Sequence, residues 1–216
     1  MVFIKRVSLL SILLSLTSCS SLYYSGLEQI GIPKREVMVH RVEKARDTQE
    51  ETKEQFKSAL EQFTEVTNYN GGDLESIYNK LNAEYEASVT QAEEVTGRID
   101  SIEDVSGALF EEWEEEINQY SSASLKRSSQ RQLDETKKKY RQLIKTMRRA
   151  ESKLEPVLIV FKDQVLYLKH NLNARAISAL KNELGGIQSD VSSLIVAMEK
   201  SIDEANSFIN SMDNKS

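Results

Sequence analysis

The stretch EEWEEEINQYSSASLKR, residues 111–127, joins an acidic arm to a basic arm through a serine-rich turn. From residue 93 to residue 116 there are ten carboxylates and one cation, Arg98. From residue 126 to residue 153 there are eleven cations and three acids. If both arms are helices that fold back at residues 121–124, opposite charges lie side by side and favour antiparallel pairing. The stretch therefore predicts a helical hairpin.

The composition of the 216 residues favours long helices over a turn-rich sheet. Charged residues make up 29% of the chain, which has only two prolines and eight glycines. An apolar content of 39% suits narrow helical seams better than a thick core. The net charge of −6, which becomes −8 without Lys5 and Arg6, does not favour nucleic acid as a partner.

Four long segments have apolar residues at alternating spacings of three and four, the pattern of amphipathic helices. We expect helices at residues 34–67, 74–120, 124–170 and 174–212, within a bundle at 33–212 that is followed by a disordered tail at 213–216. Short connections imply antiparallel neighbours. The predicted fold is therefore all-α, an elongated antiparallel helical bundle or coiled coil of about four long helices, built as one bundle or as two stacked hairpins.

Breakers and caps mark several boundaries along these helices. Pro156 removes a helical hydrogen bond and predicts a kink near residues 153–156. Asp73 and Asn173 are suited to cap the second and fourth helices, although the apolar spacing also permits a helix that runs straight through the region of Asn173. The pair Gly185-Gly186 predicts a flexible joint or a stop.

Residues 1–18 have the pattern of a secretory signal peptide, in which Lys5 and Arg6 precede an apolar run. That run is too short to span a membrane as a helix. The sequence LTSC that ends at Cys19 resembles the bacterial lipobox. The resemblance implies that Cys19 becomes the acylated first residue; an ordinary leader followed by a stray thiol is the alternative.

The destination follows from the residue after the cysteine. Ser20 stands there rather than Asp, which by the sorting rule of enteric bacteria implies an outer-membrane lipoprotein that faces the periplasm of a Gram-negative cell. Residues 19–32 then form a lipidated tether. Fully extended, this tether reaches only about 45 Å, so we expect the bundle to stay close to the membrane.

Two segments are candidates for interaction surfaces. The basic arm offers possible contacts with anionic lipid, but neutralisation by the acidic arm is the favoured reading. Its candidate residues are Lys137, Lys138, Lys139, Arg141, Lys145, Arg148 and Arg149. The apolar run after Pro156, for which helical spacing on both sides favours a helix over a strand, predicts a second surface. Its candidate residues are Val157, Leu158, Val160, Phe161, Leu166 and Tyr167.

The sequence lacks the patterns that catalysis or cofactor binding requires. His40 and His170 lie on different segments and there is one cysteine, so a zinc cluster is not expected. Neither a calcium-binding loop nor a phosphate-binding glycine loop is present, and no serine lies in a nucleophile motif. We therefore expect no enzymatic activity, no metal or other cofactor and no small-molecule substrate.

Four short stretches carry a resemblance to a known family. They are GIPKRE at 31–36, EQFKSALEQF at 54–63, ALFEEW at 108–113 and VLYLKHNLNA at 165–174. With these the chain resembles the bacterial domain-of-unknown-function family numbered 2959. The resemblance implies a secreted helical protein, often a lipoprotein, and implies no activity and no functional residues.

Together these observations predict a lipid-anchored periplasmic bundle with a structural, scaffold or protein-interaction role. Its partner is expected to be an unidentified protein or a second copy of the chain, and not nucleic acid. The alternative is a membrane-surface protein that binds anionic lipid through the basic helix.

Overall fold

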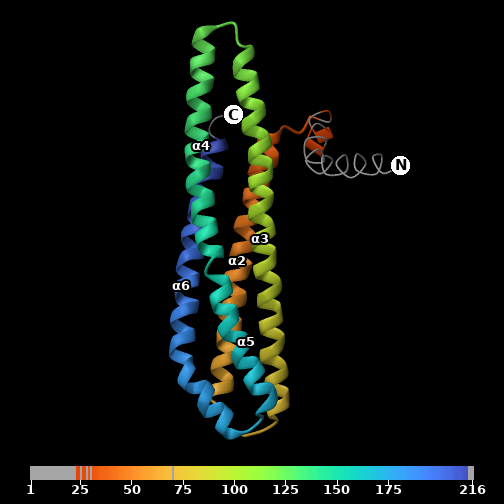
Figure 1. The fold of residues 1–216 in the computed structure, drawn as a ribbon, viewed down its shortest axis with the longest axis vertical. Helices are drawn as coiled ribbons and strands as arrows, with labels where there is room; N and C mark the ends of the chain where they lie inside the picture. The colour runs from red at the N-terminus through yellow and green to blue at the C-terminus, as the bar shows by residue number, and fades with distance from the viewer. Residues whose placement is uncertain (1–22, 25, 28, 30, 70, 214–216) are drawn as a thin grey trace, which may run out of the picture.

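The computed structural model describes residues 23–213 except residues 25, 28, 30 and 70, and these residues form an elongated all-α bundle (Figure 1). Its helices are α2 (Lys34–Thr67), α3 (Leu74–Gln119), α4 (Ala123–Glu151), α5 (Leu154–His170) and α6 (Ala174–Asp213). The predicted fold class is confirmed, since this part of the chain contains no strand. The signal peptide predicted at residues 1–18, and Cys19, lie outside the described residues.

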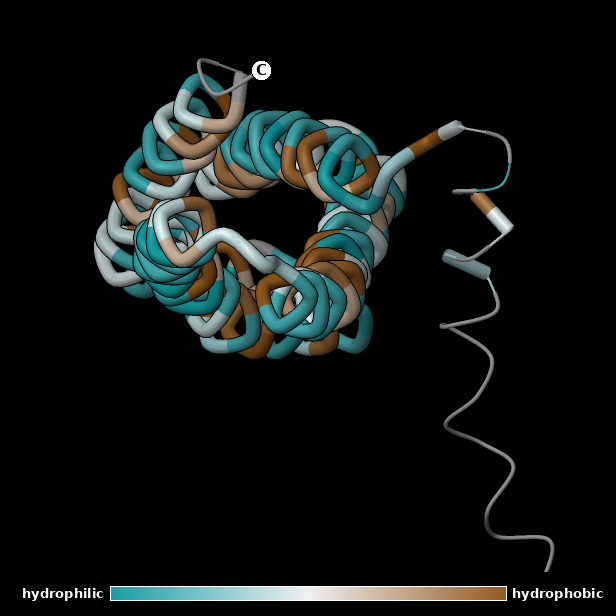
Figure 2. The backbone as a smooth tube through the Cα atoms, turned by 90° about the horizontal axis from the view of Figure 1, so that it is seen from above, coloured by the Kyte–Doolittle hydropathy of each residue, from teal (hydrophilic) through white to brown (hydrophobic). Residues whose placement is uncertain are grey.

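The helices pack in a ring around a common axis (Figure 2). α2 contacts α3 and α6, and α4 contacts the same two helices from the other side. Within the described residues, α2 and α4 make no close backbone contact, and neither do α3 and α6. The order around the ring is therefore α2, α3, α4, α6, and the face formed by α2 and α3 lies opposite the face formed by α4 and α6.

The apolar stripe of α2 shows why the chain folds this way. The residues that follow the spacing of three and four along α2 are all buried, namely Met38, Val42, Ala45, Gln49, Thr52, Phe56, Ala59, Phe63 and Val66. Similar stripes on α3 and α6 face the same axis, with Ile99 and Ile102 from α3 and Leu194 and Met198 from α6. Spacings of three and four keep each stripe on one side of its helix, so the seams meet along the whole bundle.

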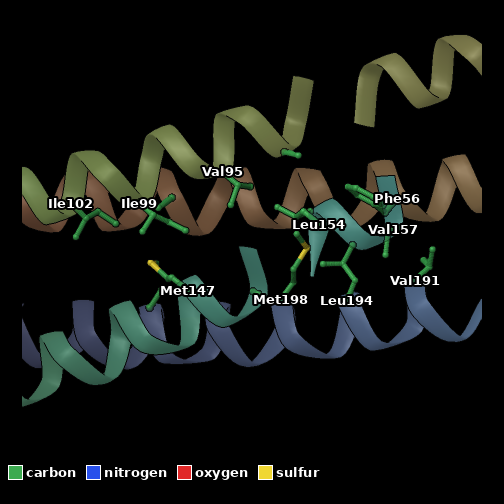
Figure 3. Close-up of a cluster of buried hydrophobic side chains, with 14 of the residues drawn as sticks. Phe56, Val95, Ile99, Ile102, Met147, Leu154, Val157, Val191, Leu194 and Met198 are labelled. Carbon is green, nitrogen blue, oxygen red and sulfur yellow. The ribbon is translucent and has the colours of Figure 1, made fainter. Parts of the chain in front are cut away.

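The third predicted helix, which begins with the basic arm, is two helices in the structure. The sequence predicts one kinked helix over residues 124–170, whereas α4 ends at Glu151 and α5 begins at Leu154. Pro156 is the third residue of α5, where its missing N–H costs no helical hydrogen bond. Just after the break, Leu154 and Val157 lie with Phe56 of α2 and Leu194 of α6 in the core (Figure 3).

The caps expected from sequence are present at two helix starts. The Asp73 carboxylate accepts a hydrogen bond from the Glu75 N–H at 3.0 Å. The Asn173 side chain accepts from the N–H groups of Arg175 and Ala176 at 3.0 and 3.1 Å, so α6 begins at a turn and does not continue α5. Of the two possibilities expected at Gly185-Gly186, the stop is wrong, because α6 runs through both residues.

The serine turn lies one residue earlier than the predicted helix bounds place it. α3 ends at Gln119 and α4 begins at Ala123, with the Ser122 hydroxyl accepting from the Leu125 N–H at 3.4 Å. Tyr120, expected to close the apolar stripe of α3, lies in this turn and is exposed. Asp213, where the predicted tail begins, belongs to α6, and residues 214–216 lie outside the described residues.

Candidate functional site

The two charged arms meet along only one edge of α4. Arg148 forms ion pairs with Asp100 and Glu103 of α3, and Lys137 forms one with Glu114. Because Lys137 and Arg148 are eleven residues apart, or about three helical turns, they lie on the same side of α4. The antiparallel pairing inferred from the charge pattern is therefore present, but it uses few of the charges.

Arg148 is the centre of this contact. Its guanidinium donates to Asp100 at 2.6 Å and to both oxygens of Glu151 at 3.0 Å, and it also donates to Glu103. The hydrogen bond to Glu103, followed by those to Asp100 and Glu151, raises the pKa of Arg148 well above its usual range. One cation thereby links α3 to the end of α4, immediately before the break.

The other cations of the basic arm are not neutralised by α3. Lys138, Lys139, Arg141, Lys145 and Arg149 are all exposed. None of them has an ion pair within 4.0 Å in the described part of the chain. The interpretation that the acidic arm neutralises the basic arm is thus correct for Lys137 and Arg148 and wrong for these five residues.

These free cations border the candidate site, a groove between α4 and α6 that we call the α4/α6 groove. It consists of two adjoining hollows of about 500 and about 570 Å³, which share Gln142 and Lys145 as lining residues. The cations along it are Lys138, Lys139, Arg141, Lys145, Arg149, Lys153 and Lys200. The sequence pattern identified most of the cations from α4, but it gave no sign that α6 forms the second wall.

The α6 wall of the groove is small and mixed in character. Ser192 and Ser193 supply hydroxyl groups, and Lys153 Nζ donates to the Ser193 oxygen at 2.9 Å. Val196 lies in the same wall and is 65% exposed, the highest value among the exposed large apolar residues of the described chain. The groove therefore combines positive charge with an apolar patch.

Two acids make the groove asymmetric along its length. Glu135 and Glu204 line the hollow that also contains Lys138, Lys139 and Arg141. The hollow nearer the α4–α5 break is lined by Lys145, Arg149, Lys153 and Lys200, with no carboxylate among its lining residues. The groove is therefore most strongly basic toward the break.

The interaction surface predicted on α5 needs correction. Val157 and Phe161 are buried, and Phe161 packs its ring 6.4 Å from Phe56 and 6.3 Å from Phe63. Leu158 and Val160 are half-buried, and only Leu166 and Tyr167 of the predicted set are exposed. The inner face of α5 belongs to the core because it replaces α4 as the wall of the bundle below the break.

A second contact, which we call the Tyr24 clasp, holds the N-terminal segment to the bundle. Tyr24 is fully buried, and its hydroxyl donates to Asp104 and accepts from Arg41 at 2.7 Å. The Arg41 guanidinium lies 5.3 Å from the centre of the Tyr24 ring and also donates to the Ser101 carbonyl. Since Arg41 belongs to α2 and Ser101 and Asp104 to α3, the clasp lies on the face that those two helices form.

The clasp controls the protonation of Tyr24. Burial, and then the hydrogen bond to Asp104, raise the pKa of Tyr24 from 10.0 to about 12. The phenol therefore stays protonated and able to donate in the range from pH 10 to about pH 12, where a tyrosine of ordinary pKa ionises. The sequence analysis missed this contact because nothing in the residues around Tyr24 indicates that it is held by groups about 17 and 80 positions away.

Within the described part of the chain, no helix is long and apolar enough to cross a membrane. The same residues contain no group of three or more His, Cys, Asp or Glu side chains placed to hold a metal ion. Cys19, the predicted lipidation site, lies outside these residues.

Comparison with known proteins gives one result that bears on identity. The model of the family described as "Protein of unknown function (DUF2959)" matches residues 23–212, which is nearly all of the described chain. Searches of curated proteins and of solved structures found no match. On the strength of the family match, this chain is a member of the DUF2959 family.

Proposed function

We propose that this protein is a lipid-anchored periplasmic helical bundle with a scaffold or protein-interaction role. The observation that carries the proposal is the Tyr24 clasp, which fixes the segment after Cys19 to the face of α2 and α3. Tyr24 lies five residues after Cys19, and five residues span at most about 18 Å. A lipid on Cys19 would therefore hold that face of the bundle close to the membrane.

The shape of the bundle supports a role as a spacer or scaffold. α3 has 46 residues, and at 1.5 Å per residue it is about 70 Å long. α6, with 40 residues, runs parallel to α3 along much of the same length and antiparallel to its neighbours α2 and α4 (Figure 1). An elongated body with a fixed attachment point presents its free faces to partners at a defined position relative to the membrane.

Acylation of Cys19 tests the proposal directly. Cells that express the full chain would be labelled with an alkyne analogue of palmitate, in the wild type and in Cys19→Ala. We expect label and outer-membrane fractionation in the wild type, and loss of both in the variant. Equal labelling of the two proteins, or release of the wild type into the soluble periplasmic fraction, would overturn the proposal.

The second candidate function is binding of anionic lipid through α4. The five free cations of α4 favour it, because basic side chains near a membrane each contribute about 1 kcal/mol of attraction to anionic lipid. Co-sedimentation of unlipidated protein with vesicles tests it. Binding that requires phosphatidylglycerol in the vesicles and disappears in Lys138→Glu/Lys145→Glu/Arg149→Glu would support this function, and equal binding to neutral vesicles would contradict it.

A further inference from the structure

The geometry points to a partner for the α4/α6 groove: an acidic helical segment of another protein, with an apolar side chain beside its carboxylates. The inference rests on the proposed function in one respect only, the side of the bundle that faces the membrane. The nature of the occupant follows from the length, charge and walls of the groove.

The length of the groove fits a segment of several helical turns. Along α4 its lining residues extend from Glu135 to Lys153, about 27 Å at the helical rise. A single lipid head group or a small anion would use one or two of the cations along this length. A helix of about 15–18 residues would lie beside all of them, as in other grooves between two helices that bind a third.

The charges define which residues the segment presents. Lys145, Arg149 and Lys200 surround the hollow nearest the break and have no ion pair in the described part of the chain. Carboxylates one turn apart on the segment would lie opposite them, since Lys145 and Arg149 are themselves one turn apart. The acids Glu135 and Glu204 make the other end of the groove less positive than the end nearest the break, so the most acidic part of the segment is expected at the end nearest the break.

The α6 wall adds an apolar requirement. Val196 is 65% exposed and stands beside Ala197, in the same wall as Ser192 and Ser193. Covering an exposed valine side chain removes apolar surface from water, so an apolar side chain opposite Val196 would stabilise the complex. A polyanion that offers only charge would leave this patch in contact with water.

The ring order of the helices argues against the anchoring bilayer as the occupant. The Tyr24 clasp lies on the face of α2 and α3, and the groove is lined by α4 and α6. These two pairs of helices form opposite faces of the ring (Figure 2). Two helices packed across a bundle make it roughly 20 Å thick. The chain from Cys19 to Tyr24 reaches at most about 18 Å and joins the bundle on the clasp side. The groove therefore faces away from the membrane that holds the lipid anchor.

Site-specific photocrosslinking in living cells tests the inference. The full-length chain would carry benzoylphenylalanine in place of Val196 in the groove, or in place of Leu125, which is 56% exposed at the hairpin turn, as a position control. Each would be combined with Lys138→Glu/Lys145→Glu/Arg149→Glu. The matched charge control is Lys126→Glu/Arg127→Glu/Arg131→Glu, which changes the same number of exposed cations on the same helix outside the groove.

We expect a protein adduct at position 196 whose crosslinked peptide is acidic and helix-forming. The adduct should fall at least tenfold in the groove variant and persist in the charge control, with circular dichroism showing that both remain helical. Adducts with lipid alone, with peptides that lack an excess of acids, or with equal yield in both charge variants would overturn the inference, as would the absence of a protein adduct. Membrane fractionation of the same cells reports separately on anchoring, so a failure of the proposed function would be recognised independently.

Discussion

Gln49 is a buried amide that has no hydrogen-bond partner within the described part of the chain. It is fully buried in the seam of α2, and neither its Oε1 nor its Nε2 has a hydrogen-bond partner. An unsatisfied buried polar group costs about 1–3 kcal/mol, whereas an apolar group of the same shape does not carry that cost. We predict that Gln49→Met raises the free energy of unfolding by about 1–2 kcal/mol in urea titrations.

Gln55 provides the matched control on the same helix. Its amide donates to the Glu84 carboxylate at 2.8 Å, so the same substitution there removes a real hydrogen bond. Gln55→Met should be neutral or destabilising. A stabilisation of equal size in both variants would mean that added apolar volume, and not the unpaired amide of Gln49, determines the effect.

Tyr24 gives a prediction about pH. Its pKa is about 12 in the folded protein and 10.0 without burial and the Asp104 contact, so the folded state holds the phenolic proton more tightly. Its contribution to stability is fully present below pH 10 and is lost as the pH rises toward 12. We predict that titration of tyrosinate absorbance contains a phase near pH 12 that is missing in Tyr24→Phe.

The neighbouring tyrosine serves as the control. Tyr23 is exposed and packs its ring 5.3 Å from that of Tyr24 without taking part in the hydrogen bonds of the clasp. Tyr23→Phe should leave the phase near pH 12 in place. Persistence of that phase in Tyr24→Phe would show that it belongs to another tyrosine.

At the scale of elements, the helices were predictable because their signal is repeated many times. Each stripe of α2, α3 and α6 repeats apolar residues on one side over many turns, so a polar residue at a single position, such as Gln49 in α2, does not change the helix. The caps at Asp73 and Asn173 were predictable for a different reason, since they depend only on residues two or three positions away.

What the sequence did not reveal depends on contacts between helices. Opposed charge blocks favour pairing, but they do not say which cations face the partner and which face solvent. Lys137 and Arg148 meet α3, whereas Lys145 and Arg149 meet the α6 side, a division set by the rotation of α4 in the ring. The assignment of Phe161 to a surface failed for the same reason, because α5 replaces α4 in the core below the break.

The two faces of α5 lead to a prediction. Phe161 is 1% exposed and lies between the rings of Phe56 and Phe63, so Phe161→Ala should destabilise the bundle by about 3–5 kcal/mol. Leu166 lies on the outer face and is 45% exposed, so Leu166→Ala should cost under about 1 kcal/mol. Thermal melting followed by circular dichroism compares the two, and similar losses would contradict the assignment of faces.

The charge pairing of α3 and α4 leads to a prediction about stability and salt. Arg148→Met removes the cation that bonds Asp100 and Glu103, and we expect a loss of about 1 kcal/mol in low salt. The loss should shrink at 1 M NaCl, where the screening length is about 3 Å. Arg149→Met is the control: Arg149 is exposed and has no ion pair in the described residues, so its removal should change stability by less than about 0.5 kcal/mol.

At the scale of the whole molecule, the Tyr24 clasp and the α4/α6 groove lie on opposite sides of the bundle. The clasp uses α2 and α3, which contact each other along the bundle, and the groove uses α4 and α6. This separation follows from the ring order, since α2 has no close backbone contact with α4 within the described residues. A chain anchored on one face can therefore keep the other face free for a partner.

The separation of faces predicts a measurable orientation on the membrane. Gly107 is exposed on α3, three residues from Asp104 of the clasp, and a side chain added there meets no atom within 4 Å. Cys19 is the only cysteine, so when it is acylated a cysteine introduced at 107 or 196 is the single reactive thiol. In vesicles that contain the lipidated protein and head-group quenchers, we expect a fluorophore at 107 to be quenched more strongly than one at 196.

The same measurement distinguishes a fixed clasp from a loose tether. In Tyr24→Ala the chain that connects the lipid to the bundle is no longer fixed after five residues and can extend over all of residues 19–32, a reach of about 45 Å. The bundle can then turn relative to the bilayer. The difference in quenching between positions 107 and 196 should then fall toward zero. The contact of Tyr24 with Arg41 and Asp104 is the feature that shortens the chain between Cys19 and the bundle. If the difference in quenching is absent in the wild type, or is unchanged in Tyr24→Ala, this contact does not set the orientation of the bundle.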